Sequence, residues 1–376
     1  MVQIPTLSDG TVTLRAPSED DIDGSVEQCQ DPLSQRWTTV PVSYTRDDAK
    51  TYLRHVIPDG WEADREWGFV VEAPDANGAL RFAGSISLRN KDEGRAEIAY
   101  GAHPWVRGRG VMESAVRLLL DWGFAERELK TVIWLAERGN WASRRLAWKL
   151  GFSVDGTLRS WVDQRGSLVD AWVGTLRSGE AMSPRTPWSE TPTIVGKRVV
   201  LRATIDADTP RLIEGANDPA VQNYSRTMRE GAPHDETTMR QRELGLQEET
   251  ATGTGVVWTV ADPTTDELLG WISLFHLQPG EYAEVGYWVH SSARGRGVAR
   301  EACQLAVRHA FVDLEDGGLG LRRLLANVAV VNQTSQRVVE AAGFERIGLE
   351  RDGTLLGNGS YVDSILYDQL SRTRHR

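Results

Sequence analysis

Apolar and polar residues follow strand-like and helix-like periods in turn along this chain. Period-two alternation and short apolar runs predict strands, and apolar residues three and four apart predict helices. The expected elements of the first half are a strand ending at residue 15, helices over 20–28 and 46–56, strands over 67–72, 81–88 and 97–103, a helix over 110–124, a strand over 131–135, a helix over 140–150, and strands over 152–159 and 168–176. This order predicts an α/β domain built around a mixed sheet.

The same pattern occurs a second time. AEIAYGAHPWVRGRGVMESA around Glu97 matches AEVGYWVHSSARGRGVAREA around Glu284, an offset of 187 residues. NWASRRLAWKLGF from Asn140 matches NQTSQRVVEAAGF from Asn332 at an offset of 192, so the second copy has gained residues, which we place in the Gly-rich stretch 313–320. A repeat this long that occurs twice indicates a duplicated globular domain, because solenoids repeat shorter units more often.

Composition places the division between the copies. Residues 178–193 are rich in Pro, Ser and Thr and have no apolar period, which is typical of a linker. The length of 376 residues suits two or three domains of about 150 residues. We therefore expect domains over 1–178 and 196–376, joined by a linker over 179–195.

Charge and cysteine content exclude several classes of function. The net charge of −10 disfavours a nucleic-acid partner and suits a cationic amine better. Cys29 and Cys303, at unrelated places in the two copies, support neither a disulfide framework nor a cysteine metal site, and the seven histidines lack metal-ligand spacing. With no basic leader and no apolar run of 18 residues, we expect a soluble, cytoplasmic protein without a membrane partner.

The repeated RGRG sequence follows a predicted strand and opens a predicted helix. Glycines allow close backbone approach and positive φ, and a helix N-terminus offers unpaired N–H groups, so a diphosphate could bind there. A tight surface turn with solvated arginines and an RNA-binding RGG segment are the alternatives. Neither a Walker loop nor a dinucleotide fingerprint is present. The candidate residues are Arg107, Gly108, Arg109, Gly110 and Val111 in the first copy, and Arg294, Gly295, Arg296, Gly297, Val298 and Ala299 in the second.

Strand, glycine loop and helix, followed by Asn-x-x-Ser and Gly-Phe, resemble the GNAT superfamily of acetyl-CoA-dependent N-acetyltransferases. The AEVGYW and GRGVAREA sequences resemble the branch that acetylates ribosomal-protein N-termini. The resemblance covers residues 11–176 and 196–370. It implies two tandem GNAT-like α/β domains, each a mixed, mostly antiparallel twisted sheet flanked by helices, with acetyl-CoA as acyl donor and no metal. The second loop fits the family pattern fully, whereas Met112 replaces the small final residue in the first.

The resemblance also implies a base. An amine attacks a thioester only when unprotonated, so a carboxylate must accept a proton directly or through water. Glu97 and Glu284 match the family position of this base, and an exposed strand carboxylate is the alternative interpretation. Tyr100 and Tyr287 are further candidates for proton relay, but core packing is the favoured role for them.

A serine on the following helix completes the expected chemistry. Ser143 and Ser335 match the family position that donates a hydrogen bond or proton to the CoA thiolate. Asn140 and Asn332 match a cofactor contact, but asparagine is also a favoured N-cap and could bond the serine N–H. The resemblance places the oxyanion near the backbone of Gly101 or Trp288.

Other recurring residues suggest structural roles. Asp170 and Asp363 are expected to fix a late strand, and His103 and His290 are expected to be satisfied surface histidines, with a cofactor contact as the alternative. Most of the 14 tryptophans lie in the first copy. The three at positions 37, 61 and 67 lie where this family covers its acceptor site, and they could either line that site or pack in the core; the corresponding stretch of the second copy, 223–249, is polar and acidic.

The sequence thus predicts a tandem N-acetyltransferase that moves an acetyl group from acetyl-CoA to a primary amine by direct attack. The acceptor could be a small-molecule amine or a peptide amine. The second copy, with the complete loop, is the favoured catalyst. One domain acting as a non-catalytic CoA-binding or interaction module, and an acyl-CoA sensor without turnover, are the alternatives. The fused pair is expected to be a monomer that imitates a dimer, or a homodimer.

Overall fold

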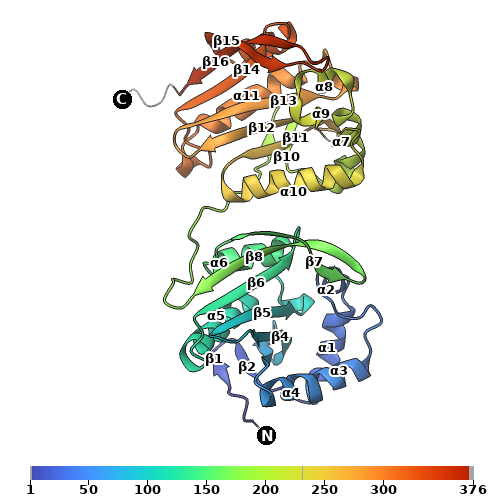
Figure 1. Cartoon of the computed structure of the whole chain (residues 1–376), viewed down its shortest axis with the longest axis vertical. Coiled ribbons are helices and arrows are strands. Elements are labelled where there is room, and N and C mark those ends of the chain that lie inside the picture. Colours follow the sequence, from blue (N-terminus) through green and yellow to red (C-terminus); the bar gives the residue numbers. More distant parts are fainter. Residues whose placement is uncertain (1, 231, 372–376) are drawn as a thin grey trace. The chain divides into compact units, whose positions relative to one another are not determined.

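The computed structural model describes residues 2–230 and 232–371. Its contacts divide the chain into two compact units, Met1–Arg185 and Thr186–Arg376, each with a hydrophobic core of its own. The division falls inside the stretch 179–195 expected as a linker. Each unit contains one eight-stranded sheet with helices against it (Figure 1), which confirms the α/β class and the duplication.

In the first unit the strand order is β1-β2-β3-β4-β5-β6-β8-β7. The pairing of β5 with β6 is parallel and the other pairings are antiparallel, so the sheet is mixed and mostly antiparallel, as predicted. Its elements are β1 (Leu7–Ser8), β2 (Thr13–Arg15), α1 (Asp21–Gln30), α2 (Pro32–Trp37), α3 (Arg46–Thr51), a π-helical turn (Tyr52–Val56), α4 (Ile57–Glu62), β3 (Glu66–Pro74), β4 (Leu80–Asn90), β5 (Arg95–Ala102), a 3-10 turn (Pro104–Val106), α5 (Val111–Glu126), β6 (Thr131–Glu137), α6 (Trp141–Lys149), β7 (Gly156–Gln164) and β8 (Ser167–Arg177).

The second unit repeats this topology, with strand order β15-β16-β14-β13-β12-β11-β10-β9 and β13 parallel to β14. Its elements are β9 (Ile194–Val195), β10 (Val200–Arg202), a 3-10 turn (Asp206–Asp208), α7 (Thr209–Ala216), α8 (Pro219–Tyr224), α9 (Arg226–Arg229), α10 (Glu236–Thr252), β11 (Val256–Ala261), β12 (Leu268–Gln278), β13 (Tyr282–Val289), a 3-10 turn (Ser291–Ala293), α11 (Val298–Phe311), a 3-10 turn (Leu314–Asp316), β14 (Arg323–Ala329), α12 (Gln333–Ala341), β15 (Glu345–Leu355) and β16 (Tyr361–Leu370). The extra residues lie between α11 and β14, where the Gly-rich stretch predicted them.

Two tryptophans of the first copy belong to its core. Trp61 and Trp67 are 4% and 3% exposed, and both rings pack against Trp122 with centroids 5.5 and 5.9 Å apart. The Arg127 guanidinium lies 4.4 Å from the Trp67 ring centroid, close enough for a cation–π contact. Core packing is therefore the correct interpretation of Trp61 and Trp67.

Two local predictions were incomplete. Helix α2 was not expected, although Asp31 is a sound N-cap that accepts from the Ser34 N–H, and Pro32 suits the first helical position. The helix expected over 46–56 begins with a capping box between Thr45 and Asp48 but continues through the π-helical turn into α4. The π-helical turn changes the side-chain period, which explains why the pattern seemed to end early.

The parallel strands separate beyond a few pairs, and this separation positions the site. In the first unit the pairing of β5 with β6 ends at Ile98 and Trp134, and in the second the pairing of β13 with β14 ends at Glu284 and Leu325. The rest of β5 and β13 pairs only on its other side, with β4 and β12. The central strands therefore diverge ahead of the glycine loops.

Candidate active site

The glycine loops have nearly the same backbone in the two units. Gly108 and Gly110 have φ of 74° and 78°, and Gly295 and Gly297 have the same two values. These are left-handed conformations, which favour glycine. A Cβ at Gly108, Gly110 or Gly295 would meet no atom within 4 Å, so open space faces these positions. Helices α5 and α11 begin directly after, with no side chain capping their first N–H groups. The loops therefore fit a diphosphate.

The first arginine of each loop holds the loop against a helix. Arg107 Nη2 donates to Asp31 Oδ1 at 2.5 Å, and Arg294 Nη2 donates to Asp218 Oδ2 at 2.7 Å. Asp31 and Asp218 are the N-caps of α2 and α8. The side chains of Arg107 and Arg294 thus contribute to the loop's shape. The guanidinium of Arg109 lies 5.2 Å from the ring centroid of Trp105, and the carbonyl of Arg296 accepts from Arg198 at 3.5 Å.

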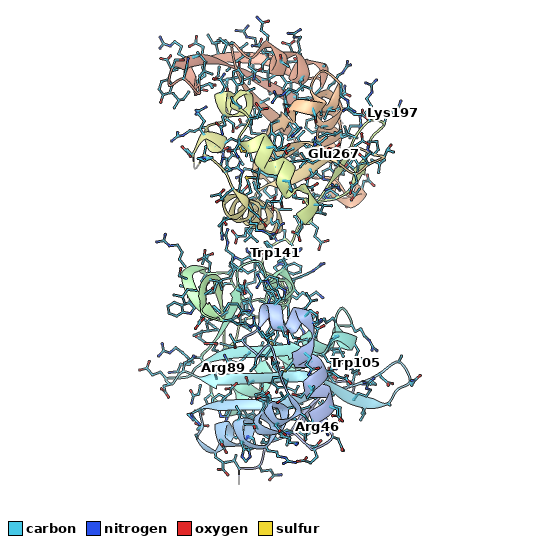
Figure 2. All side chains as sticks on the ribbon, turned by 90° about the vertical axis from the view of Figure 1, so that its right-hand side faces the viewer. Arg46, Arg89, Trp105, Trp141, Lys197 and Glu267 are labelled. Atoms are coloured by element: carbon cyan, nitrogen blue, oxygen red, sulfur yellow. The ribbon has the colours of Figure 1, made fainter. Side chains whose placement is uncertain are left out.

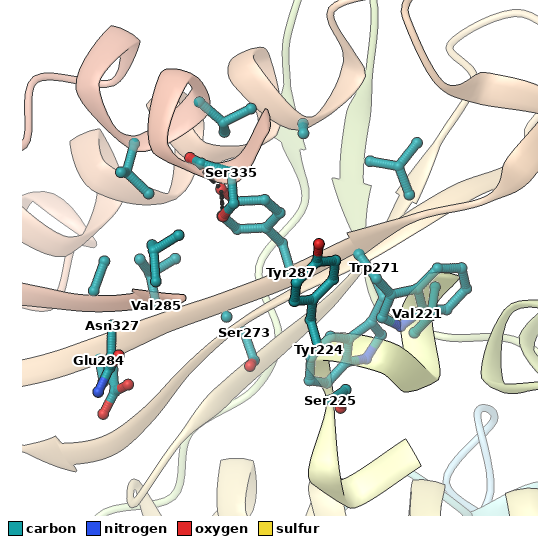
Figure 3. Close-up of a pocket in the computed structure, with 18 of the residues that line it drawn as sticks. Val221, Tyr224, Ser225, Trp271, Ser273, Glu284, Val285, Tyr287, Asn327 and Ser335 are labelled. Atoms are coloured by element: carbon teal, nitrogen blue, oxygen red, sulfur yellow. Dashed lines mark hydrogen bonds between the residues drawn. The ribbon is translucent and has the colours of Figure 1, made fainter. Parts of the chain in front are cut away.

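A large cavity of about 1890 Å³ opens in the second unit. Its wall includes Arg294, Gly295, Gly297, Val298 and Ala299 of the loop and helix α11, and Asn332 at the start of α12. It also includes Ser335 of α12 and Glu284 and Tyr287 of β13 (Figure 3). The cavity therefore connects the proposed diphosphate loop with the candidate catalytic side chains. Helix α10 contributes its other side, through Arg242, Gly245, Leu246 and Glu249.

Each unit pairs a tyrosine with the candidate serine. Tyr100 Oη lies 2.8 Å from Ser143 Oγ, and Tyr287 Oη lies 2.8 Å from Ser335 Oγ. Burial raises the pKa of both phenols, that of Tyr100 to about 12, so both stay protonated near neutral pH. In the first unit Trp134 Nε1 also donates to Ser143 Oγ at 3.0 Å.

The asparagines cap the helices that carry these serines. Asn140 Oδ1 accepts from the Ser143 N–H at 3.2 Å, and Asn332 Oδ1 accepts from the Ser335 N–H at 3.1 Å. The capping interpretation is therefore correct for both. Capping leaves a cofactor contact open, because Asn332 also lines the large cavity.

The two candidate bases have different neighbours. Glu97 contacts Arg89 at 3.2 Å and Lys91 at 3.0 Å, so each of its oxygens meets a cation; Figure 2 labels Arg89 on β4. Within the described part of the chain, the one charged partner of Glu284 is His276, whose ring nitrogen lies 3.7 Å from the carboxylate. Burial raises the pKa of Glu284, and His276 offsets this only in part. The cause lies in the strand partners, because Phe275 stands opposite Glu284 where Arg89 stands opposite Glu97.

Glu284 and Tyr287 project from opposite faces of β13, since they are an odd number of residues apart. Figure 3 shows Tyr287 directed toward Ser335 and Glu284 directed away from it. The structure therefore brings Tyr287, Ser335 and Asn332 together on one face and places Glu284 on the other. The last pair between β13 and β14 is Glu284 with Leu325, so the two strands separate just after Glu284. The gap between these strands connects the two faces of the sheet.

The recurring histidines and late aspartates are structural. His103 and His290 are each 6% exposed, so the expectation of surface histidines was wrong. Both accept a backbone N–H of the next 3-10 turn and contact a glutamate, Glu27 or Glu214. Asp170 accepts from the Ser160 N–H and Asp363 from the Asp352 N–H, at irregular points of β7 and β15, which confirms their role in fixing a strand.

Neither a metal-binding cluster nor a membrane-spanning helix occurs among the described residues. Among residues 2–230 and 232–371, no group of three or more His, Cys, Asp or Glu residues could hold a metal ion. No helix in that part of the chain is long and apolar enough to span a membrane. Both cysteines, Cys29 and Cys303, are buried and free.

The chain is similar in sequence to known acetyltransferases. The family model of the acetyltransferase (GNAT) domain matches residues 11–153 and 198–345. A putative ribosomal N-acetyltransferase of Bacillus subtilis (strain 168) is 39% identical over 106 residues, and a ribosomal-protein-serine acetyltransferase of Escherichia coli (strain K12) is 33% identical over 106 residues. Each of these matches covers 28% of this chain, and they cover 55% and 56% of the respective relatives, so the chain spans about half their length.

A longer match and a solved structure accompany them. An uncharacterized N-acetyltransferase of Bacillus licheniformis is 28% identical over 181 residues, which is 46% of this chain and 97% of that protein. The structure of a ribosomal L7/L12 α-N-protein acetyltransferase in complex with coenzyme A is 22% identical, with a TM-score of 0.42, and covers 48% of this chain and 98% of that one. Because the family model matches most of both units, this chain belongs to the GNAT acetyltransferase family, and it carries the family's domain twice.

Proposed function

We propose that this protein is an acetyl-CoA-dependent N-acetyltransferase that acts on a primary amine by direct transfer, with the second unit as catalyst. One observation carries the proposal: a single cavity joins the glycine loop at Gly295 and Gly297 to Ser335, Tyr287 and Glu284. The relatives named for acetylation of ribosomal proteins favour a peptide amine as acceptor. A small-molecule amine fits the same chemistry.

The loop and the helix after it would hold the donor. The open backbone at Gly295, the left-handed turn at Gly297 and the first N–H groups of α11, from Val298 and Ala299 onward, suit its diphosphate. Asn332, at the start of α12, lines the same space. When bound, acetyl-CoA supplies a thioester carbonyl for attack and a thiolate as leaving group. The corresponding residues of the first unit are Gly108, Gly110, Val111 and Asn140.

Glu284 would accept the proton that the attacking amine loses. A free α-amine has a pKa of about 7.7–8.0 and is mostly protonated at neutral pH. Burial raises the pKa of Glu284 above the usual glutamate value, which makes its carboxylate a stronger proton acceptor at neutral pH. The proton moves from the amine nitrogen to the carboxylate directly or through one water.

Ser335 would serve the departing sulfur. Its hydroxyl can donate to the thiolate while Tyr287 Oη, 2.8 Å away, donates to the serine oxygen in turn. The Asn332 cap fixes the backbone at Ser335, so the hydroxyl is held at the cavity wall. Such a pair stabilises negative charge without itself gaining a formal charge.

The first unit is better suited to a supporting role, as a non-catalytic CoA-binding or interaction module. Its candidate base Glu97 forms ion pairs with both Arg89 and Lys91, so both oxygens of its carboxylate are already engaged. The indole of Trp134 occupies one acceptor position on Ser143. These neighbours, together with Met112 after the loop, distinguish it from the second unit. A sensor without turnover would retain cofactor binding in both units.

Thiol release from acetyl-CoA tests the proposal. We expect turnover with a panel of peptide and small amines. We expect Glu284→Gln to lower kcat about 10²- to 10⁴-fold, the usual contribution of a general base. The matched variant Glu97→Gln should keep nearly full activity. Full activity in both single variants would refute the assignment of these bases. Loss confined to Glu97→Gln would move catalysis to the first unit.

A further inference from the structure

Strand β12 has a bulge directly beside the candidate base Glu284. Phe275 pairs with Glu284, and the register shifts between Phe275 and Gln278, so two residues of β12, His276 and Leu277, stand against one of β13. In the first unit β4 and β5 pair residue for residue through the equivalent stretch. A bulge re-aims the side chains beside it. Here it brings the His276 ring to 3.7 Å from the Glu284 carboxylate.

The backbone of His276 lies in the left-handed region, with φ of 51°. Few residues other than glycine adopt this conformation, and it costs folding free energy that glycine would not lose. Such backbone strain is often kept at functional sites. A histidine at this position therefore calls for an explanation beyond the shape of the strand.

The neighbouring residue holds the histidine ring. The rings of Phe275 and His276 meet edge to face, with centroids 4.9 Å apart. A Cβ on Gly286 of β13 would lie 2.9 Å from the Phe275 ring, so glycine leaves room for that ring. The residue at the repeat offset of 187 in the first unit is Ala99. The bulge, the phenylalanine and the glycine thus form one arrangement that the first unit lacks.

Carboxylates surround the pair formed by His276 and Glu284. Glu249 of α10 acts electrostatically on His276, and Glu350 of β15 acts on Glu284, while Arg242 of α10 offsets the charge of Glu249 in part. Burial raises the pKa of Glu249 as well as that of Glu284. Nearby carboxylates favour a positive charge on an imidazole. The His276 side chain is 73% exposed, so it meets water as well as Glu284.

We propose that His276 is a relay residue, which receives from Glu284 the proton that the bound ammonium loses and releases it to water. This inference rests on the proposed function. His276 and Glu284 both line the large cavity, and a small rotation of the exposed ring would shorten the 3.7 Å contact to a hydrogen bond. In the first unit the partners of Glu97 are Arg89 and Lys91, which have donors only and accept no proton.

Each step of the relay moves one proton. An N–H bond of the ammonium breaks as an O–H bond forms on Glu284, and that O–H bond breaks as Nδ1 of the neutral imidazole gains the proton. The proton on Nε2 then leaves to water, and the neutral amine attacks the thioester. In model peptides a histidine side chain has a pKa of about 6.5 and a glutamate about 4.3, so a proton that ends on imidazole leaves up to about 100-fold more neutral amine.

The variant His276→Asn tests proton transfer with the bulge retained. Asparagine tolerates a left-handed backbone but takes up no proton near neutral pH. Because burial already raises the pKa of Glu284, we expect part of the full effect, a fall in kcat for thiol release of about 10-fold. The acid limb of the kcat profile should move to lower pH, where a carboxylate alone titrates. His55→Asn, at an exposed histidine of the first unit, should change neither.

The variant His276→Gly separates this role from a structural one. Glycine adopts φ of 51° without strain, so the Tm of the second unit should stay the same or rise while kcat falls. Imidazole added to the buffer should restore part of kcat, because the ring position is exposed, and should restore none in Glu284→Gln. In the Glu284→Gln background, His276→Asn should cause no further loss, since it acts through Glu284.

The outcomes separate the relay from the proposed function. If no amine is acetylated, the proposed function fails and the relay fails with it. If Glu284→Gln is fully active, the assignment of Glu284 as base fails, and the relay through it fails as well. If Glu284→Gln loses activity but His276→Asn keeps the wild-type kcat and acid limb, the relay alone is overturned. It is also overturned if His276→Gly loses both Tm and kcat and imidazole restores nothing.

Discussion

Removing the hydroxyl group of Tyr287, in the variant Tyr287→Phe, tests whether the hydrogen bond between Tyr287 and Ser335 supports turnover. Tyr287 Oη lies 2.8 Å from Ser335 Oγ and 3.2 Å from the Ser335 carbonyl oxygen. Phenylalanine keeps the ring and removes both contacts. A hydrogen bond between neutral groups contributes about 0.5–1.5 kcal/mol net. Since about 1.4 kcal/mol is a tenfold change in rate, Tyr287→Phe should lower kcat about 2- to 12-fold.

The first unit provides the matched control. In Tyr100→Phe, Ser143 keeps the indole N–H of Trp134 at 3.0 Å, and that unit is not the proposed catalyst. We expect kcat to stay within about twofold of the wild type, the lower limit of the effect of one neutral hydrogen bond. Both variants should lower the free energy of unfolding of their own unit by about 1 kcal/mol.

The assay is thiol release at saturating acetyl-CoA and acceptor, with calorimetry of each variant. An unchanged kcat in Tyr287→Phe, combined with a large loss in Ser335→Ala, would show that the serine acts without the tyrosine. An equal loss in Tyr100→Phe and Tyr287→Phe would refute the claim that only the second unit turns over.

Three further predictions concern pH, stability and the donor. Because the base must be ionised and burial raises the pKa of Glu284, kcat should fall on the acid side with a midpoint above 4.5, and Glu284→Gln should remove that limb of the pH profile. Asp208→Asn breaks the ion pair in which the Asp208 carboxylate, 3% exposed, lies 2.7 Å from Arg202. Calorimetry should therefore show a loss of about 3–5 kcal/mol in the free energy of unfolding of the second unit alone. Gly297→Ala forces a side chain into φ of 78°, so it should cost about 1–2 kcal/mol and raise the KM for acetyl-CoA, measured by kinetics beside calorimetry.

The features that sequence could predict are local. The glycine loops follow from residues that must adopt positive φ, and the Asn–Ser cap follows from a spacing of three within one helix turn. Each of these local features occurs in both copies of the repeat, which strengthens the prediction for each copy. The fold class followed from the order of strand and helix periods, which survives even where individual ends shift.

Contacts between strands could not be predicted in the same way. The repeat offset is 187 at Glu97 and Glu284, but strand pairing matches Arg89 with Phe275, an offset of 186. A one-residue difference in register decides whether a cation or an aromatic ring stands opposite the candidate base. Linear comparison of the copies does not show this, so Glu97 and Glu284 seemed equivalent.

Glu243, a residue of α10 that lines a small cavity of about 50 Å³, could not be recognised from the sequence for a different reason. It lies in the run RQRELGLQEET, where helix α10 carries many charged residues and no clear apolar stripe. A glutamate that faces a cavity cannot be distinguished there from its exposed neighbours by period alone. Only the packing of α10 over β11 and the caps that align it with the first copy identify the position as a core one.

The differences between the two sites come in compensating pairs, which explains how the copies diverged while each core stayed filled. On β6 and β8 of the first unit, Trp134 stands opposite Gly174, where a Cβ would lie 2.0 Å from the Ser153 carbonyl oxygen and 3.3 Å from the indole. On β14 and β16 of the second unit, Ala326 stands opposite Tyr367. Large and small residues have exchanged places, as close packing requires. Trp134 reaches Ser143, whereas Ala326 lines the large cavity. A single Trp134→Ala change would leave a void beside the glycine, so neither site becomes the other by one substitution.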